Sequence, residues 1–252
     1  TFEDTEDGIK GYVQESLFDE NAMNDVISNF MLPDVTINAN IQEAEYKNWN
    51  EEWEEAGFER ININDSITIY DARHDDGNGI ASGISIGIET KQAFGTGTHE
   101  TTRMIVSTLL NIDLKGKRVL DCGCGTGILG IAASKLGASE VVGYDIDEWS
   151  SENAIHNAEL NGVGNMKVML GDASVLKSVE GKFDVVLANI NRNILLADMP
   201  AFVSVMADDS LLILSGFYAS DVDLLIEKAS SLGLSKIDSK SDSEWTCLVL
   251  KK

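Results

Sequence analysis

The sequence predicts a doubly wound α/β fold, and three observations support that prediction. From Gly116 onward, short apolar segments alternate with longer amphipathic segments. The apolar segments are rich in Val, Ile and Leu, which is typical of parallel strands that are covered on both faces. One of them, Val119–Cys122, runs directly into a glycine-rich turn that precedes a helical segment. A turn of this kind is typical of the first strand-to-helix connection of doubly wound proteins.

The expected elements follow one another along the second half of the chain. Strands are expected at Arg118–Cys122, Glu140–Asp145, Met166–Leu170, Phe183–Asn189 and Leu211–Ser215. Helices are expected at Ile128–Leu136, Glu148–Asn161, Asn193–Met206 and Ser220–Ser231. Two further apolar segments, Leu234–Ser239 and Glu244–Leu250, are separated by a short turn rich in Ser and Asp. They predict a terminal antiparallel hairpin.

The first part of the chain has a less regular pattern. Strand-like segments are Val35–Glu43, Ser66–Ala72 and Ile84–Glu89, the acidic segment Ala44–Ala56 is helical in character, and Asp75–Gly83 has the composition of a loop. We expect a small α+β N-terminal domain over residues 1–46, a linker helix over residues 47–62 and the main domain over residues 63–252. Because the chain begins with Thr1 and not with Met, we expect the N-terminal domain to be incomplete.

The composition restricts the class of protein. Hydrophobic residues make up 43% of the chain and there are 2 prolines, which is typical of a folded globular protein. No segment approaches the roughly 18 consecutive apolar residues of a membrane helix, and no secretory signal is visible. The 3 cysteines and 3 histidines show no disulfide framework and no metal-binding spacing. We therefore expect a cytoplasmic protein without a metal and without a membrane partner.

The net charge of −23 indicates which partners are favoured. A field this negative repels phosphate backbones, so a nucleic-acid substrate is disfavoured, whereas a basic protein would be attracted. A large net charge also serves solubility alone, and that interpretation stays open.

The glycine-rich turn Asp121–Gly127 is the strongest indication of a ligand site. Its glycines allow positive φ angles and let a ligand approach the backbone closely. Asp145 closes the next strand, where an acidic side chain can accept hydrogen bonds from both hydroxyls of a ribose. Residues Gly125–Gly130 also match the dinucleotide pattern G-x-G-x-x-G, with Asp145 20 residues after Gly125. A nicotinamide-dependent oxidoreductase is therefore one alternative.

Three residues favour S-adenosylmethionine over a dinucleotide. Asp121 precedes the turn, where it can orient the amino-acid end of that cofactor, directly or through water. Gly123 adds a glycine before the dinucleotide pattern begins. Asp172 follows the third strand and places a carboxylate where an adenine amino group would lie. We therefore expect a methyltransferase that uses S-adenosylmethionine.

Two further motifs identify a family. The segment Gln92–Thr102 (QAFGTGTHETT) precedes the first strand of the main sheet, and Ala188–Asn191 (ANIN) ends the fourth. Together with Val119–Gly127 and Gly143–Asp147, these motifs closely resemble the bacterial ribosomal protein methyltransferases known as PrmA. The resemblance covers about residues 45–252 and includes the dipeptide Glu244-Trp245.

The resemblance implies a seven-stranded, Rossmann-like class I methyltransferase domain that follows a substrate-recognition domain and a linker helix. It implies repeated methylation of lysine side chains and of the N-terminal amine of the eleventh protein of the large ribosomal subunit. Thr102, Gly123, Asp145 and Asn189 stand at the family's cofactor-contact positions. The whole cofactor site that we expect consists of Phe94, Thr102, Asp121, Gly123, Gly125, Asp145, Asp172 and Asn189. We expect a monomer.

The reaction itself suggests the catalytic residues. A methyl group on a sulfonium is already activated, so the protein has only to align a neutral amine with it. A lysine is protonated at neutral pH and must first lose a proton, which an acidic environment would oppose. We therefore expect neutral groups, Asn189 and Thr101, to act as the catalytic residues, together with the backbone carbonyl of Ile190. His99 is expected to stabilise its loop.

The residues after Asn189 bear on the substrate. Enzymes that methylate planar nitrogens carry Asn/Asp-Pro-Pro-Tyr/Phe here, whereas this chain has Asn189-Ile190-Asn191-Arg192 without proline or an aromatic ring. A planar base or a glutamine amide is therefore disfavoured. Two alternatives stay open besides the oxidoreductase, namely methylation of another amine and an inactive cofactor-binding module.

Overall fold

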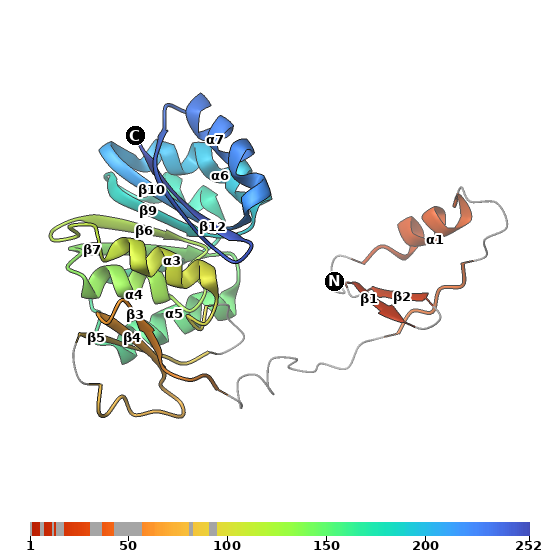
Figure 1. The fold of residues 1–252 in the computed structure, drawn as a ribbon. Coiled ribbons are helices and arrows are strands. Elements are labelled where there is room, and N and C mark those ends of the chain that lie inside the picture. Colours follow the sequence, from red (N-terminus) through yellow and green to blue (C-terminus); the bar gives the residue numbers. More distant parts are fainter. Residues whose placement is uncertain are drawn as a thin grey trace. The chain divides into compact units, whose positions relative to one another are not determined.

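The computed structural model describes residues 2–5, 8–11, 13, 18–30, 37–42, 57–80, 83–90 and 95–252. The chain forms two compact units, Thr1–Trp49 and Asn50–Lys252, which are considered separately below (Figure 1). Among the described residues, no helix is long and apolar enough to cross a membrane.

The described residues of the first unit form a hairpin and a helix. The strands β1 (Phe2–Thr5) and β2 (Gly8–Gly11) pair antiparallel, and α1 (Glu20–Ser28) begins where the Asp19 carboxylate accepts a hydrogen bond from the Ala22 N–H at 3.0 Å. The hairpin was not expected, because its strands are only four residues long. The strand expected at Val35–Glu43 is wrong for residues 37–42, which have no regular structure, since that stretch alternates Ile with Asn without a neighbouring strand.

The second unit begins with a small mixed sheet in the order β3 (Ile61–Ile63), β4 (Ile67–Asp71), β5 (Ile84–Ile88). β3 and β4 are antiparallel, and β4 and β5 are parallel. The linker helix expected over residues 47–62 is wrong at its end: residues 57–60 have no regular structure and Ile61 begins β3. Isoleucine alternates with asparagine there, which is a period of two. The rest of that helix, residues 47–56, and the whole of the expected helix Ala44–Ala56 lie outside the described residues.

The main sheet has seven strands, as expected, in the order β11-β12-β10-β9-β6-β7-β8. Its parallel part consists of β6 (Arg118–Cys122), β7 (Glu140–Asp145), β8 (Met166–Leu170), β9 (Phe183–Asn189) and β10 (Met206–Tyr218). β11 (Ser235–Asp242) and β12 (Trp245–Lys251) form the expected terminal hairpin, and β12 pairs antiparallel with β10. The doubly wound α/β prediction is thus confirmed.

Helices cover both faces of this sheet (Figure 1). On one face, α3 (Glu100–Leu109), α4 (Ile128–Lys135) and α5 (Glu148–Leu160) share an apolar core with the small sheet. On the other face, α6 (Arg192–Val205), α7 (Val222–Ser231) and the short helices η2 (Ala173–Ser178) and η3 (Ala219–Asp221) cover the second core. β10 starts five residues earlier than expected, because α6 ends at Val205 and the strand continues from Met206 through Ala207 and three polar residues with an irregular register against β9.

Candidate active site

The glycine-rich turn lies at the carboxyl end of β6. Gly123, Gly125 and Gly127 have φ angles of 65°, 53° and 80°, a region in which side chains are strained. At Gly123 a methyl group would lie 2.5 Å from Cγ2 of Ile190, so a larger residue would not fit. Hydrogen bonds from the Cys124 N–H to the Tyr144 carbonyl at 3.0 Å and from the Gly127 N–H to the Cys124 carbonyl at 2.8 Å fix the turn.

Asp145, at the end of β7, holds the turn from the neighbouring strand. Its Oδ2 accepts a hydrogen bond from the Gly125 N–H at 2.8 Å, and its Oδ1 accepts one from the Asp147 N–H at 3.1 Å. A carboxylate has about four lone-pair sites, so both oxygens can still accept hydroxyl donors. Asp145 therefore both positions the turn and offers two acceptors beside it.

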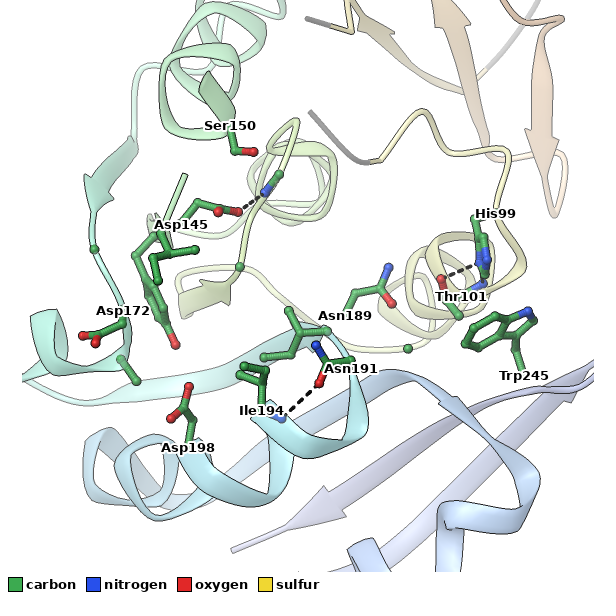
Figure 2. Close-up of a pocket in the computed structure, with 18 residues that line it drawn as sticks. His99, Thr101, Asp145, Ser150, Asp172, Asn189, Asn191, Ile194, Asp198 and Trp245 are labelled. Atoms are coloured by element: carbon green, nitrogen blue, oxygen red, sulfur yellow. Dashed lines mark hydrogen bonds between the residues drawn. The ribbon is translucent and has the colours of Figure 1, made fainter. Parts of the chain in front are cut away.

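A cavity of about 550 Å³ opens next to these residues. Figure 2 shows Asp145 and Asp172 at one end of it, His99, Thr101 and Trp245 at the other, and Asn189 between them. The cavity therefore extends across the carboxyl ends of the parallel strands, where doubly wound proteins bind their ligands.

Asp121 is fully buried beneath the turn and does not line the cavity. Its Oδ2 accepts a hydrogen bond from the Gly130 N–H at 2.9 Å, and its Oδ1 has no partner in the described part of the chain. Burial raises the pKa of the Asp121 carboxyl to about 7; the Gly130 N–H opposes this shift and the negative charge of Asp145 adds to it. Burial under the turn therefore destabilises the charged form of Asp121, and a nearby cation would stabilise it.

The cysteines of the turn are inert spacers in this geometry. Cys122 and Cys124 are buried, and burial raises the pKa of both thiols well above the usual value. Both thiols therefore stay protonated at neutral pH and are poor nucleophiles.

Two carboxylates lie at the same end of the cavity as Asp145. Asp172 caps η2 by accepting a hydrogen bond from the Ser174 N–H at 2.9 Å, and hydrogen bonds from Ser174 lower the pKa of its carboxyl. Asp198 lines the cavity from α6, and its carboxyl pKa is raised by burial and by the charge of Asp172. This end of the cavity therefore offers several acceptors to the amino and hydroxyl groups of a nucleoside.

Asn189 ends β9 in the middle of the cavity. Its Nδ2 donates a hydrogen bond to Oγ1 of Thr102 at 3.3 Å, so its amide oxygen is available to another donor. Thr102 is buried in the first turn of α3, directly behind Asn189.

An aromatic group lies at the far end of the cavity: His99 and Trp245 line the cavity, and Tyr218 packs against Trp245. The ring of Trp245 lies 4.8 Å from that of His99 in an edge-on arrangement, and 4.5 Å from that of Tyr218. His99 is the N-cap of α3: its Nδ1 accepts a hydrogen bond from the Thr101 N–H at 3.3 Å and lies 2.8 Å from Thr101 Oγ1. These contacts give His99 a structural part in its loop.

The structure brings most of the residues that the sequence singled out to one place. Lining the cavity are Thr101, Gly123, Gly125, Asp145, Asp172 and Asn189. Thr102 and Asp121 lie behind the lining, and Phe94 lies outside the described residues.

Sequence reasoning missed several lining residues, among them Tyr144, Ile146, Ser150, Ile194, Asp198, Gly216 and Trp245. Ile146 carried a usable signal in the sequence, because it follows Asp145 directly; in the structure its side chain is 76% exposed. Gly216 has a φ of 92°, and a methyl group there would lie 2.6 Å from the Ile190 carbonyl oxygen. Asp198 carried no signal in the sequence, since only the packing of α6 brings it to the cavity.

The residues present suit S-adenosylmethionine. Asp145 offers acceptors for ribose hydroxyls, and the glycines of the turn leave room for a ligand against the backbone. The unpartnered buried oxygen of Asp121 supplies negative potential under the turn, which suits a cationic ligand.

Comparison with known proteins places the chain in a family. A family model described as "Ribosomal protein L11 methyltransferase (PrmA)" matches residues 2–252. Relatives with the name ribosomal protein L11 methyltransferase include one from Phocaeicola vulgatus, 47% identical over 98% of this chain and 87% of its own length. Another, from Bacteroides fragilis, is 43% identical over 98% of this chain and 88% of its own length.

Solved structures agree with this assignment. A ribosomal protein L11 methylase from Lactobacillus delbrueckii subsp. bulgaricus has a TM-score of 0.70 and 30% identity, over 77% of this chain and 98% of its own. A precorrin-6y C5,15-methyltransferase from Geobacter metallireducens, at 12% identity and a TM-score of 0.53, shares the fold alone. With its turn, its cavity and its relatives in agreement, the chain is an S-adenosylmethionine-dependent methyltransferase, and it belongs to the ribosomal protein L11 methyltransferase family.

Proposed function

We propose that this enzyme methylates lysine side chains and the N-terminal amine of ribosomal protein L11. The observation that carries the proposal is Asn189, which stands in the middle of the cavity with its amide nitrogen bonded to Thr102 and its oxygen available. A neutral acceptor at this point suits an aliphatic amine that must be uncharged when it reacts. The names of the relatives supply the protein substrate.

We assign one end of the cavity to the cofactor, because hydrogen-bond acceptors gather there. When bound, S-adenosylmethionine supplies an activated methyl group on a sulfonium. In our proposal Asp145 accepts the ribose hydroxyls, Asp172 faces the adenine amino group, and the turn at Gly123 and Gly125 passes under the amino-acid part. Asp121 lies below the turn and does not line the cavity, and a cationic ligand near it would favour its charged form.

The acceptor end of the site prepares the amine. Asn189 orients the amine by accepting one of its hydrogens, and Thr102 holds the Asn189 amide in that orientation. Thr101 and the Ile190 backbone border the same space and are uncharged. Because no carboxylate is among these immediate neighbours, the neutral form of the amine is not penalised.

The aromatic group supports repeated methylation of one nitrogen. Each added methyl group makes the ammonium larger and more weakly hydrated, and aromatic rings attract such cations. Trp245 contacts the ring of His99 edge-on and the ring of Tyr218 in a tilted arrangement, so its ring is held in place. We propose that this wall retains a partly methylated lysine for a further turnover.

The charge of the chain supports a basic protein partner and not a nucleic acid. The net charge of −23 favours encounter with a positively charged protein and disfavours phosphate backbones. All three cysteines are free and buried, which is compatible with the cytoplasm, where ribosomal proteins are made.

The test is a transfer experiment with methyl-labelled S-adenosylmethionine and the purified proteins and RNA of the large ribosomal subunit. We expect label in L11, at lysines and at the N-terminal amine when its peptides are mapped by mass spectrometry. Asp145→Ala serves as the control for cofactor-dependent labelling. Label in another protein or in the RNA, with none in L11, would overturn the proposal.

A further inference from the structure

Three asparagines of α5 bind the open edge of β5. Asn153, Asn157 and Asn161 are four residues apart, so they share one face of the helix. β5 pairs with β4 on its other side, and no strand of the described part of the chain pairs with it on this side. The edge of β5 would therefore leave backbone groups without partners, and the three amides take the place of a strand.

The hydrogen bonds follow a regular pattern. Asn161 accepts from the Gly87 N–H at 3.0 Å and donates to the Gly87 carbonyl at 2.6 Å. Asn157 accepts from the Glu89 N–H at 2.9 Å and donates to the Glu89 carbonyl at 3.0 Å, to which Asn153 also donates at 2.9 Å. Four helical residues rise about 6 Å and two strand residues about 6.6 Å, so the two repeats match.

Asn157 makes one contact that Asn161 does not. Its Nδ2 also donates to the backbone carbonyl of Thr126 at 3.0 Å, and Thr126 stands between Gly125 and Gly127 in the glycine-rich turn. Both Asn157 and Thr126 are fully buried. Thr126 in turn donates from its Oγ1 to the Gly95 carbonyl at 2.6 Å, in the segment that leads to Thr101.

The surroundings of the Asn157–Thr126 hydrogen bond indicate that it fixes the backbone of the turn. α5 approaches the turn closely, since a methyl group at Gly127 would lie 3.1 Å from Cβ of Ala154. On the opposite side, the Gly125 N–H must meet Oδ2 of Asp145. The two glycines that flank Thr126 give the backbone no side-chain packing of their own, so a hydrogen bond to the carbonyl between them sets the plane of that peptide.

We propose that Asn157 is a positioning residue for cofactor binding. It joins the edge of the small sheet to the glycine-rich turn and holds the turn in the shape that accepts S-adenosylmethionine. Asn161 has the same residue type and the same pair of bonds to β5, and it serves the small sheet alone. The inference rests on the cofactor site proposed above and does not depend on which amine is methylated.

The experiment compares three variants of the full chain, Asn157→Ala, Asn161→Ala and Asp145→Ala, by calorimetric titration with S-adenosylhomocysteine. Thermal unfolding without ligand is measured for each. We expect both asparagine variants to unfold at lower temperature than the parent. Only Asn157→Ala should also raise the Kd for S-adenosylhomocysteine, by about tenfold, because only there is the Thr126 carbonyl left unpaired. In Asn161→Ala the Kd should change by less than about twofold.

The remaining variants separate the possible failures. An unchanged Kd in Asp145→Ala would mean that the cofactor site itself is misplaced. If Asp145→Ala does bind S-adenosylhomocysteine more weakly, an equal Kd for Asn157→Ala and Asn161→Ala would overturn the positioning role of Asn157. Asn157→Leu keeps the approximate size of the side chain and removes its acceptor and both donors, so it replaces Asn157→Ala if that variant does not fold. Its Kd should rise to a similar extent, and a parental Kd would also count against the proposal.

Discussion

Asp121 is a carboxyl group whose surroundings favour its protonated form. Burial raises its pKa from 3.8 to about 7, although the Gly130 N–H stabilises the anion. Between these two pH values the folded protein keeps a proton that the unfolded chain has lost. The stability that neutral Asp121 contributes is therefore complete below pH 3.8 and is lost as the pH rises through about 7.

Replacing Asp121 with Asn should remove this pH dependence. The amide oxygen can still accept from the Gly130 N–H, and the side chain no longer ionises. Urea denaturation of the ligand-free protein at pH 5, 6, 7 and 8 gives the free energy of unfolding of the variant and of the parent. The value for Asp121→Asn minus the value for the parent should increase with pH. We expect a change of at most about 1.4 kcal/mol per pH unit up to pH ~7, and a plateau above it. A difference that stays constant across this range would show that Asp121 is ionised throughout.

Asn189 is the residue on which turnover should depend most. Asn189→Ala removes the oxygen that orients the amine, so we expect kcat to fall by roughly 10- to 100-fold while the Kd for S-adenosylhomocysteine changes little. Thr102→Val removes only the acceptor of the Asn189 amide and should give an intermediate loss.

Asn191→Ala is the matched control for Asn189. The Asn191 side chain accepts from the Ile194 N–H at 3.2 Å and caps α6, so its loss should leave kcat within about threefold. If Asn189→Ala keeps its kcat and only the KM for the cofactor rises, Asn189 is a binding residue without a part in catalysis.

At the scale of elements, the sequence predicted best where each element buries its own apolar residues. The bounds of β6, β7, β8 and β9 match the expected strands, and β6, β7 and β9 are largely buried. The strands that were missed, β1, β2 and β3, have three or four residues each, so even the alternation in β3 is too short to identify a strand. Residues 208–210 of β10 are polar and lie at the irregularity in the register against β9, between Met206 and Leu211, so they carry no apolar strand pattern.

The candidate site also has a part that the local sequence predicts and a part that it does not. The glycine-rich turn and Asp145 belong to one strand-turn-helix-strand unit, so their proximity follows from local sequence. The contact between Asn189 and Thr102 joins residues 87 positions apart, and Trp245 reaches the cavity only through the terminal hairpin. No pattern in the sequence gives such distances, although the resemblance to the family pointed to these residues.

Three elements meet in the aromatic group, since β10, β12 and the start of α3 each contribute a ring. Trp245→Ala should therefore lower the share of fully methylated lysine among the products, with a smaller effect on the first methyl transfer, because the unmethylated amine relies on Asn189. Trp245→Phe keeps a ring and should retain most of the parental distribution. Mass spectrometry of the methylated substrate over time measures both effects.

Trp149→Ala is the control for loss of an indole, because Trp149 is half-exposed on α5 and does not line the cavity. Its product distribution should equal that of the parent. If Trp245→Ala slows every methyl transfer equally, the aromatic group binds the lysine chain and does not favour the methylated forms.

At the scale of the whole molecule, the negative charge is spread over both units. Residues 1–49 contain 11 Asp and Glu residues against two lysines, while the glycine-rich turn, Asp145 and Asn189 all lie in the second unit. We propose that the first unit recognises the basic protein substrate and that the second unit binds the cofactor. Attraction between opposite charges would speed the encounter and would be screened by salt.

Deletion of residues 1–49 separates these two tasks. The shortened chain should bind S-adenosylhomocysteine with a Kd within about threefold of the parent, because the residues that we assign to the cofactor site all belong to the second unit. Its kcat/KM for intact L11 should fall by at least about 100-fold, whereas a short lysine peptide at high concentration should be methylated at a rate similar to that of the parent. In the parent, raising the salt from about 0.05 to 0.5 M should increase the KM for L11 more than it lowers kcat, since the Debye length falls roughly threefold. A shortened enzyme with parental kcat/KM on L11 would assign recognition to the second unit, where the acidic residues around the cavity would then be its source.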